Sequence, residues 1–359
     1  MAKKKYYRTT NIDKLNANYN ILLGQRSNGK SYAVKEKVLM KAYHKNKKFV
    51  YLRRYQIDVK TSDVESYFGD MPIESITDGE YNFISAYRGN IYFATLDEDN
   101  NITRGPAIGR YVYLSGYHHF KSQTFPDTED IIVEEFVTDG IYIDNEPEVL
   151  QNFVSTIARD NPNVKVWMIG NTISRVCPYF EEWCLDKIPR QKPGTIDTYT
   201  FERYDEPSEQ IVKTLIAVEY CESTGSISSL FFGKSAEHIT AGQWQTKDMP
   251  KLPSKKDDYT MVYELLFEDN GFRFVMQLMV NPKNGGQFIY VYPYTYPRTI
   301  KRKITNRFST DPFETSSFNP KIPAEVKMKE LMDLGKICYM DNLTGSDFEN
   351  VLMNRKGAL

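Results

Sequence analysis

The 359-residue sequence predicts an α/β fold built around a mainly parallel β-sheet, and three observations predict it. A glycine-rich loop, Gly24–Ser31, lies between an apolar run and a helical stretch. A second apolar run, Asp130–Val133, ends in two adjacent carboxylates. Short continuous apolar runs also alternate with stretches of helical periodicity, which is the pattern of strands that crossover helices bury on both faces.

The glycine-rich loop matches G-x-x-x-x-G-K-S, and the apolar run Tyr19–Leu23 before it and the helix after it are the flanks that a phosphate-binding loop needs. Its glycines let backbone N–H groups point inward at an anion, Lys30 adds positive charge near the β- and γ-phosphates, and Ser31 can ligate Mg²⁺. The alternative is a glycine-rich turn that caps an ordinary helix, and the flanks count against it. The expected ATP-binding residues are Gly24, Gln25, Arg26, Ser27, Asn28, Gly29, Lys30, Ser31 and Tyr32.

The elements after the loop continue the pattern. Apolar spacing predicts a helix over about 30–44, and a continuous apolar strand follows at Lys47–Tyr55 and contains the pair Arg53 and Arg54 near its end. Doubly wound folds bind their ligands at the carboxyl edge of the sheet, so both arginines are candidates for a sensing or coupling role. Residues 79–116 hold short strand-like pieces around an Asp- and Asn-rich hairpin tip, and we expect an insertion there.

The strand at 130–133 leads into Glu134 and Glu135, which is typical of a Walker B element. Successive strand residues face opposite ways, so one carboxylate can face Mg²⁺ and its waters while the next faces the attacking water. We therefore expect Glu134 to serve the metal ion and Glu135 to activate the water. A solvated acidic pair at the end of a strand is the alternative.

A helix is predicted over 147–158 with Arg159 at its last turn, and a strand over 164–169 is followed by Asn171. Asn171 is a candidate to orient the attacking water or sense the γ-phosphate, or it is simply a turn-forming residue. Arg159 either complements the helix dipole or stabilises charge on a neighbouring subunit's γ-phosphate, and its position alone does not choose. A strand between the Walker A and Walker B strands indicates the additional-strand (ASCE) class of P-loop ATPases. Without an N-K-x-D motif, ATP is favoured over GTP.

Composition excludes several other classes. The chain is 41% hydrophobic with a formal net charge of −1, which argues against a protein that coats nucleic acid through overall charge. It has no apolar run of about 18 residues and no apolar segment after its basic N-terminus, so we expect a cytoplasmic protein without a membrane partner. Four cysteines without a C-x-x-C pair and four histidines suggest reduced thiols and no metal beyond nucleotide-bound Mg²⁺.

Together these motifs resemble one family, the DNA-packaging (encapsidation) ATPases of small short-tailed phages of picovirus type, which are related to terminase large subunits. The resemblance covers about residues 1–205 and is weaker beyond. The segments that carry it are Gly24–Ser31, Phe49–Tyr55, Lys121–Pro126, Ile131–Phe136, Gly170–Asn171 and Cys177–Phe180.

The resemblance implies a homomeric ring, a pentamer, that docks on the portal of an empty prohead in the host cytoplasm and pumps double-stranded DNA inward by hydrolysing ATP. Carried over by position, Lys30 and Ser31 hold phosphate and Mg²⁺, Glu135 is the catalytic glutamate and Arg159 is the arginine donated in trans, unless Arg53 or Arg54 takes that role. The family usually has Asp where this chain has Glu134, which leaves the division of labour between the two glutamates open.

The resemblance also implies a C-terminal α+β domain of RNase H-like fold. Alternating strands are predicted at 259–267, 272–280 and 287–292, but Glu264 and Glu268 lack a partner pair of aspartates, so we expect a vestigial nuclease. The basic stretch after these strands is either a solvated face or a contact for DNA or a structural packaging RNA. Its cations are Arg298, Lys301, Arg302, Lys303 and Arg307.

The expected domains are an ATPase domain at 1–206, a small linker subdomain at 207–250 with a helix over 209–218, and the C-terminal domain at 251–359. Two other functions remain open at this point. One is a terminase with a live nuclease, and the other is a nucleotide-gated assembly protein that binds ATP without hydrolysing it.

Overall fold

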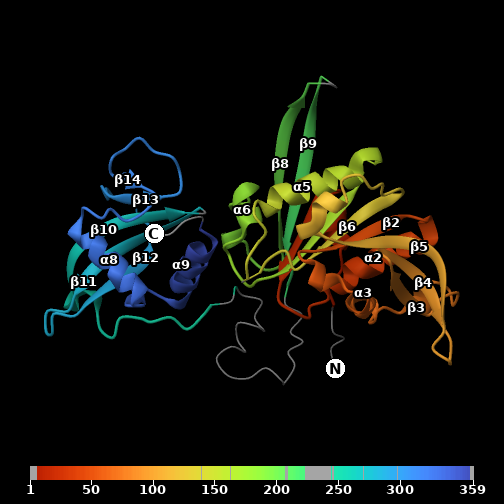
Figure 1. The fold of residues 1–359 in the computed structure, drawn as a ribbon, viewed down its shortest axis with the longest axis horizontal. Coiled ribbons are helices and arrows are strands. Elements are labelled where there is room, and N and C mark those ends of the chain that lie inside the picture. The colour runs from red at the N-terminus through yellow and green to blue at the C-terminus, as the bar shows by residue number, and fades with distance from the viewer. Residues whose placement is uncertain are drawn as a thin grey trace. The chain divides into compact units, whose positions relative to one another are not determined.

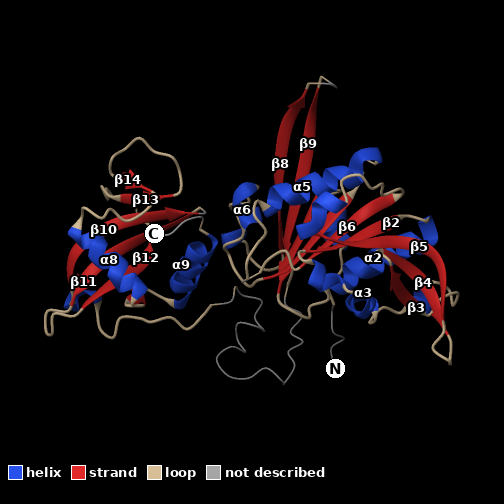
Figure 2. Ribbon diagram, in the orientation of Figure 1, coloured by secondary structure: helices blue, strands red, loops and turns tan. Residues whose placement is uncertain are grey.

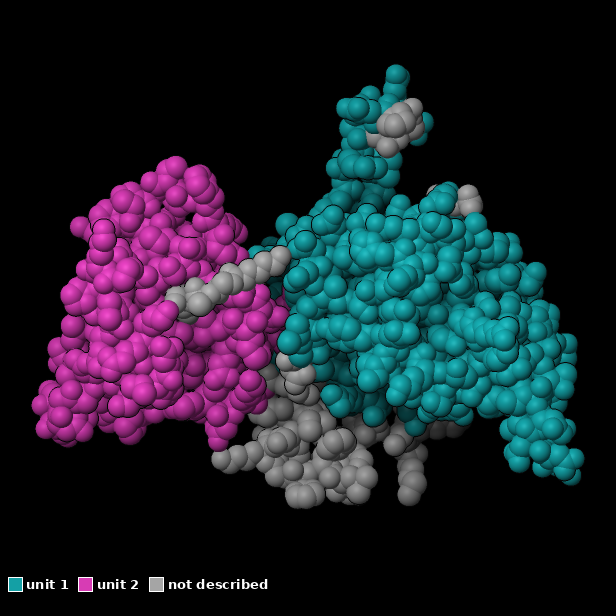
Figure 3. Space-filling view, in the orientation of Figure 1, with its two compact units in different colours: residues 1–173, 178–244 teal, residues 174–177, 245–359 magenta. Residues whose placement is uncertain are grey.

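The computed structural model describes residues 6–138, 140–161, 163–206, 209–222, 244, 246–269, 271–296 and 298–355. The chain divides into two compact units, which Figure 3 colours separately. Unit 1 comprises residues 1–173 and 178–244, and unit 2 comprises residues 174–177 and 245–359. Among the described residues, no helix is both long enough and apolar enough to cross a membrane.

Unit 1 is built on a sheet with the strand order β3-β4-β5-β2-β6-β7-β1-β9-β8 (Figure 1). The run from β5 to β9 is parallel throughout, and antiparallel pairs close both edges. The strands are β1 (Tyr19–Gly24), β2 (Lys48–Arg53), β3 (Phe83–Tyr87), β4 (Asn90–Leu96), β5 (Ile102–Tyr113), β6 (Thr128–Glu134), β7 (Lys165–Asn171), β8 (Thr195–Asp205) and β9 (Gln210–Tyr220). The expectation of a mainly parallel sheet is confirmed.

The helices of unit 1 pack against this sheet (Figure 2). They are α1 (Thr10–Asp13), α2 (Lys30–Lys45), α3 (Thr61–Phe68), α4 (Ile73–Ile76), α5 (Glu146–Ile157) and α6 (Pro178–Glu182). Since β7 lies between β1 and β6, an extra strand separates the Walker A strand from the Walker B strand. This arrangement is the one that the additional-strand class requires.

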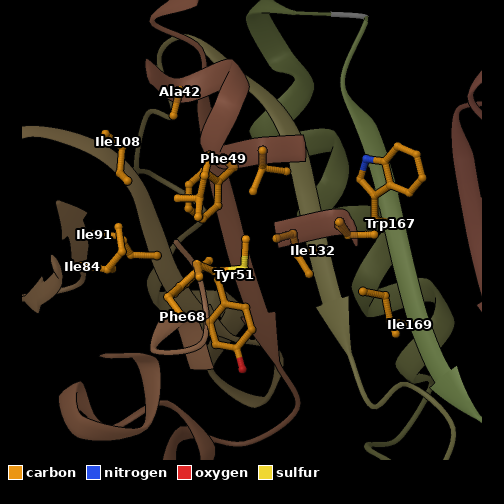
Figure 4. Close-up of a cluster of buried hydrophobic side chains, with 14 of the residues drawn as sticks. Ala42, Phe49, Tyr51, Phe68, Ile84, Ile91, Ile108, Ile132, Trp167 and Ile169 are labelled. Carbon is orange, nitrogen blue, oxygen red and sulfur yellow. The ribbon is translucent and has the colours of Figure 1, made fainter. Parts of the chain in front are cut away.

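The main core lies between the sheet and the helices α2 and α3. Figure 4 shows Phe49 and Tyr51 of β2 beside Phe68 of α3, with Trp167 and Ile169 on β7 in the same cluster. Their sequence neighbours on these strands are buried against the opposite face of the sheet. Burial on both faces explains why these strands have continuous apolar sequences instead of alternating ones.

The predicted insertion at 79–116 is part of this same sheet. Its strands β3 and β4 form a hairpin, and β4 pairs with β5 across the predicted tip. The second half of β5 then runs parallel to β2. The segment therefore extends the sheet at one edge.

The helix predicted over 209–218 is wrong, because those residues fall almost entirely in strand β9. β9 pairs in parallel with β1 and in antiparallel with β8, so β8 and β9 complete the sheet of unit 1 and β9 is not part of a helical linker. Its β-branched residues suit a strand, and sheet pairing outweighs local helical spacing. The Ser/Gly-rich piece that follows falls mostly outside the described residues.

Unit 2 contains a mixed sheet with the order β14-β13-β10-β11-β12-β15. Helices α8 and α9 contribute Met328, Leu331, Phe348 and Val351 to its core. The elements are β10 (Thr260–Asp269), β11 (Phe272–Val280), β12 (Gln287–Pro293), β13 (Lys303–Thr305), β14 (Glu314–Thr315), α8 (Pro323–Asp333), β15 (Ile337–Tyr339) and α9 (Asn342–Asn354). The three strands predicted for this region are therefore present.

Unit 2 also includes four residues from far upstream, 174–177. Val176 belongs to its core, Arg175 pairs with Asp347, and Asn350 donates to the hydroxyl of Ser174 at 3.0 Å. The expected boundary near residue 251 misses this segment. A single boundary along the chain cannot separate these units, because the chain enters unit 2 for four residues and then returns to unit 1.

Candidate functional site

The Gly24–Ser31 loop connects β1 to α2 at the carboxyl edge of the sheet. Gly24 has φ 154°, and a Cβ there would lie 3.1 Å from the carbonyl oxygen of Cys221. Gly29, at φ 94°, is the residue before the first turn of α2. These left-handed conformations favour glycine, and they bring the loop's N–H groups together at a helix N-terminus, where an anion is stabilised.

Lys30 is buried within this loop. Its Nζ donates to the carbonyl oxygen of Gln25 at 2.7 Å and to Oδ1 of Asn28 at 3.1 Å. Burial lowers the pKa of Lys30 to about 8. The buried Nδ2 of Asn28 has no hydrogen-bond partner within the described structure. The buried ammonium of Lys30 and the unpaired amide donor of Asn28 are in the same loop and are suited to bind a phosphate group.

A cavity of about 760 Å³ opens over the loop. It is lined by seven of the nine expected ATP-binding residues, by Glu134 and Glu135, and by Asn171. The two others, Gly24 and Gln25, form the start of the loop. The structure thus brings together residues that the sequence separates by more than a hundred positions.

Sequence reasoning missed one wall of this cavity, which is formed by Tyr6, Tyr7 and Arg8. The N–H of Tyr7 donates to the carbonyl oxygen of Asn28 at 3.1 Å, and its hydroxyl donates to Glu219 of β9 at 2.7 Å. This N-terminal segment has no periodicity or motif that would have revealed it. Only its contacts with the loop and β9 place it at the site.

Glu134 is the last residue of β6 and is buried. The hydroxyl of Tyr67, on α3, donates to its Oε1 at 2.8 Å. Burial raises the pKa of Glu134, while hydrogen bonds from Ser31 and Tyr67 oppose that rise. Ser31 and Glu134 are therefore adjacent, and an oxygen pair of this kind beside a phosphate loop suits Mg²⁺.

Glu135 follows β6 in the left-handed conformation, with φ 55°. Its side chain is 58% exposed and accepts a hydrogen bond from Nη2 of Arg53 at 2.8 Å. It lines the cavity over the loop and also a second pocket that contains Arg53 and Arg54. The two glutamates therefore differ sharply in burial although they are adjacent in sequence.

The two neighbouring arginines have different surroundings. Arg53 reaches Glu135, whereas Arg54 pairs with Glu146 at 2.7 Å, with side chains 10% and 2% exposed. Both arginines pair with carboxylates of their own chain. Arg159 lies in the turn after α5, exposed and outside the cavity, with one long contact of 3.5 Å to the carbonyl oxygen of Lys121.

The basic stretch in unit 2 does not behave as one set. Arg302 is buried and forms a two-point ion pair with Glu325, so the prediction that it binds nucleic acid is wrong. A guanidinium with its donors satisfied inside a domain is structural. The other four cations are more accessible: Arg298 contacts Glu264 at 2.8 Å, Lys303 and Arg307 contact Glu268, and Lys301 is exposed.

The candidate nuclease acids are occupied by these contacts. Glu264 is shared by Arg298 and by the amide of Gln277, and Glu268 lies within 4 Å of Arg273 as well as Lys303. Among the described residues, no cluster of three or more His, Cys, Asp or Glu could hold a metal ion. The arrangement offers no two-metal centre in the part of unit 2 that the structure describes.

The fold and the site define an additional-strand P-loop nucleotide-binding protein. Residues 1–192 match the model of the family described as Podovirus DNA encapsidation protein (Gp16). The chain belongs to this family, and the resemblance seen in the sequence is confirmed.

Comparison with individual proteins agrees. The DNA packaging protein of Bacillus phage phi29 is 28% identical over 183 residues, which is 50% of this chain and 50% of that protein. The DNA packaging protein of Bacillus phage B103 is 29% identical over 164 residues, 45% of this chain and 46% of that one. The chain therefore spans about half the length of the curated relatives it matches. A chain of the bacteriophage Phi-29 viral genome packaging motor assembly has the same fold, with a TM-score of 0.56 at 19% identity over 97% of this chain and 99% of that one.

Proposed function

We propose that this protein is the ATP-hydrolysing subunit of a viral DNA-packaging motor. One observation carries the proposal: Lys30, Glu134 and Glu135 line one cavity at the carboxyl edge of the sheet, in a chain that belongs to the DNA encapsidation family. The subunit would assemble as a homomeric ring, a pentamer in our proposal, at the portal of a prohead in the host cytoplasm. It would move double-stranded DNA inward.

In this mechanism the loop's N–H groups, Lys30 and Asn28 hold the phosphates of ATP. Ser31 and Glu134 are the residues that would hold Mg²⁺, which when bound neutralises charge on the phosphates. Glu135, exposed at the cavity, would orient the attacking water and accept its proton. The difference in burial between the two carboxylates supports this division of labour.

Three further residues would couple subunits and nucleotide states. Arg53 holds Glu135 at 2.8 Å, so a water bound near the γ-phosphate must compete with Arg53 for this carboxylate. Asn171 lines the cavity at the end of β7 and would sense the γ-phosphate. Arg159, outside its own cavity, is the arginine proposed to act on a neighbour's nucleotide.

Unit 2 is proposed to be a vestigial nuclease domain that contacts nucleic acid. Counted from β10, its first five strands follow the order 3-2-1-4-5 with only the second antiparallel to the others, and β15 adds a sixth strand in parallel beside the third. The order of the first five strands supports an RNase H-like sheet. The accessible cations Arg298, Lys301, Lys303 and Arg307 would contact the phosphate backbone of DNA or of a structural packaging RNA. Such contacts weaken as salt rises.

The test is steady-state ATP hydrolysis by the purified full chain, with and without duplex DNA and proheads, comparing wild type with Glu135→Gln and Arg159→Ala. We expect DNA and proheads to stimulate wild-type turnover, and each variant to lose it. Mixing the two variants should restore part of the activity, because a subunit with intact Glu135 then meets a neighbour with intact Arg159. Tight ATP binding without turnover under any condition would instead indicate the nucleotide-gated assembly protein.

A second measurement separates the motor from a terminase with a live nuclease. Duplex DNA incubated with the protein and divalent metal ions should stay intact. Cleavage that persists in Lys30→Ala and is lost in Glu264→Ala would overturn the vestigial assignment of unit 2.

A further inference from the structure

A buried group of three side chains comes from three separate elements. Arg54 follows β2, Glu146 begins α5 and Tyr179 lies in α6. Nε and Nη2 of Arg54 donate to the two carboxylate oxygens of Glu146 at 2.7 and 2.9 Å, and the hydroxyl of Tyr179 donates to the same carboxylate at 2.9 Å. We call the ion pair of Arg54 with Glu146 the Arg54 clamp.

The clamp also holds the backbone at the end of the Walker B strand. Arg54 donates from Nη1 to the carbonyl oxygen of Glu135 at 3.2 Å and from Nη2 to that of Phe136 at 2.8 Å. Glu135 has φ 55°, a conformation that is unfavourable for a residue with a Cβ and persists only where its surroundings enforce it. Arg54 restrains this conformation directly, because it holds the carbonyl oxygens of Glu135 and of the next residue, Phe136.

The far end of the same loop is held by the same carboxylate. Glu146 accepts a hydrogen bond from the N–H of Ile143 at 2.9 Å, and the guanidinium of Arg54 lies 4.8 Å from the ring of Tyr142. Both ends of the 135–146 segment are thus tied to one ion pair. A planar guanidinium with five donors can make all these contacts at once, whereas an ammonium group cannot.

We propose that Arg54, braced by Glu146, is the positioning residue for the Glu135 carboxylate. This rests on the proposed ATPase function, in which Glu135 activates water. Arg54 does not line the cavity over the loop, so it acts on the reaction only through the backbone of Glu135. Its neighbour Arg53 contacts the Glu135 carboxylate itself, so adjacent arginines hold one glutamate by its main chain and by its side chain.

The test compares Arg54→Lys with wild type in DNA-stimulated ATP hydrolysis and in binding of a fluorescent ATP analogue. A lysine keeps the charge opposite Glu146 but cannot also hold both carbonyl oxygens. We expect kcat to fall by about tenfold or more, because a small displacement of a reacting group is costly, while KM and analogue affinity stay within about twofold. Tyr179→Phe, which leaves every Arg54 contact in place, is the matched control and should retain most of the activity. If Arg54→Lys does not fold, Glu146→Gln replaces it, since the isosteric amide removes the charge that braces Arg54.

A double-variant comparison distinguishes positioning from general loosening of the fold. If Arg54 acts only through Glu135, Arg54→Lys should produce no further loss of turnover in a Glu135→Gln background. Wild-type kcat in Arg54→Lys, or a parallel loss of kcat and nucleotide affinity, overturns the positioning role and leaves the ATPase proposal standing. A wild-type protein without turnover under any condition overturns both.

Discussion

The buried pair of Arg302 and Glu325 provides a quantitative test of how unit 2 is held together. Nε and Nη2 of Arg302 donate to the carboxylate at 2.6 and 3.0 Å, and the two side chains are 6% and 0% exposed. Glu325 also accepts from the hydroxyl of Tyr263 at 2.7 Å and from the N–H of Asn319 at 2.6 Å. Burial alone would raise the pKa of Glu325, but these hydrogen bonds outweigh burial and the pKa is lowered.

Arg302→Ala would leave this carboxylate charged and buried without its counter-ion. Breaking a buried pair from one side costs about 3 to 5 kcal/mol. We expect unit 2 to lose this much of its free energy of unfolding. Amide hydrogen exchange in β10 and β11 measures the loss, since each 1.4 kcal/mol corresponds to about tenfold faster exchange. Because the lowered pKa makes the ionised form stabilising, wild-type unit 2 should itself lose stability as pH falls through the folded-state pKa of Glu325.

Arg307→Ala is the matched control, because Arg307 is 73% exposed and its contact with Glu268 is 3.9 Å long. It should change stability by no more than about 0.5 kcal/mol, and it should weaken salt-dependent DNA binding if the surface cations contact phosphate. A loss below about 1 kcal/mol in Arg302→Ala would refute the structural role assigned to the pair. The double variant Arg302→Met with Glu325→Leu should recover much of the stability, since it leaves no buried charge.

Two further predictions concern the nucleotide site. The pKa of Lys30 is about 8 in the free protein, and bound phosphates favour its charged form, so affinity for a non-hydrolysable ATP analogue should fall as pH rises through 8. The variant Lys30→Arg is charged throughout this range and should bind the analogue without such a pH dependence. The same pH dependence of affinity in both proteins would contradict the role of Lys30 in holding phosphate. Tyr67→Phe removes the hydrogen bond to Glu134, so the Mg²⁺ concentration for half-maximal ATPase activity should rise by up to about tenfold. An unchanged Mg²⁺ requirement would mean that Tyr67 does not hold Glu134 in its functional position.

Local chemistry made much of the site predictable. The phosphate loop is contiguous in sequence, and its glycines, Lys30 and Ser31 act mainly through backbone curvature and short-range contacts. The strand that ends in Glu134 and Glu135 is likewise marked by its own residues, and burial on both faces makes β2, β6 and β7 visible as apolar runs. These features depend on residues that are neighbours along the chain, so they can be predicted from a single sequence.

Other assignments depended on partners distant in sequence. β9 carries helix-like spacing, yet pairing with β1 and β8 makes it a strand. The basic run did not reveal that Arg302 is buried, because its partner Glu325 lies 23 residues further on. The wall formed by Tyr6, Tyr7 and Arg8 has no local signal of any kind.

The sequence by itself determined the phosphate loop, the acidic strand end and the class of fold, because each is written in adjacent residues or in a regular period. Only the tertiary structure decided the contacts of Arg53 and Arg54, which are neighbours in sequence but pair with different carboxylates. It also assigned residues 174–177 to unit 2. Burial and ion pairing depend on contacts between segments that are distant in sequence, and such contacts exist only in the folded chain.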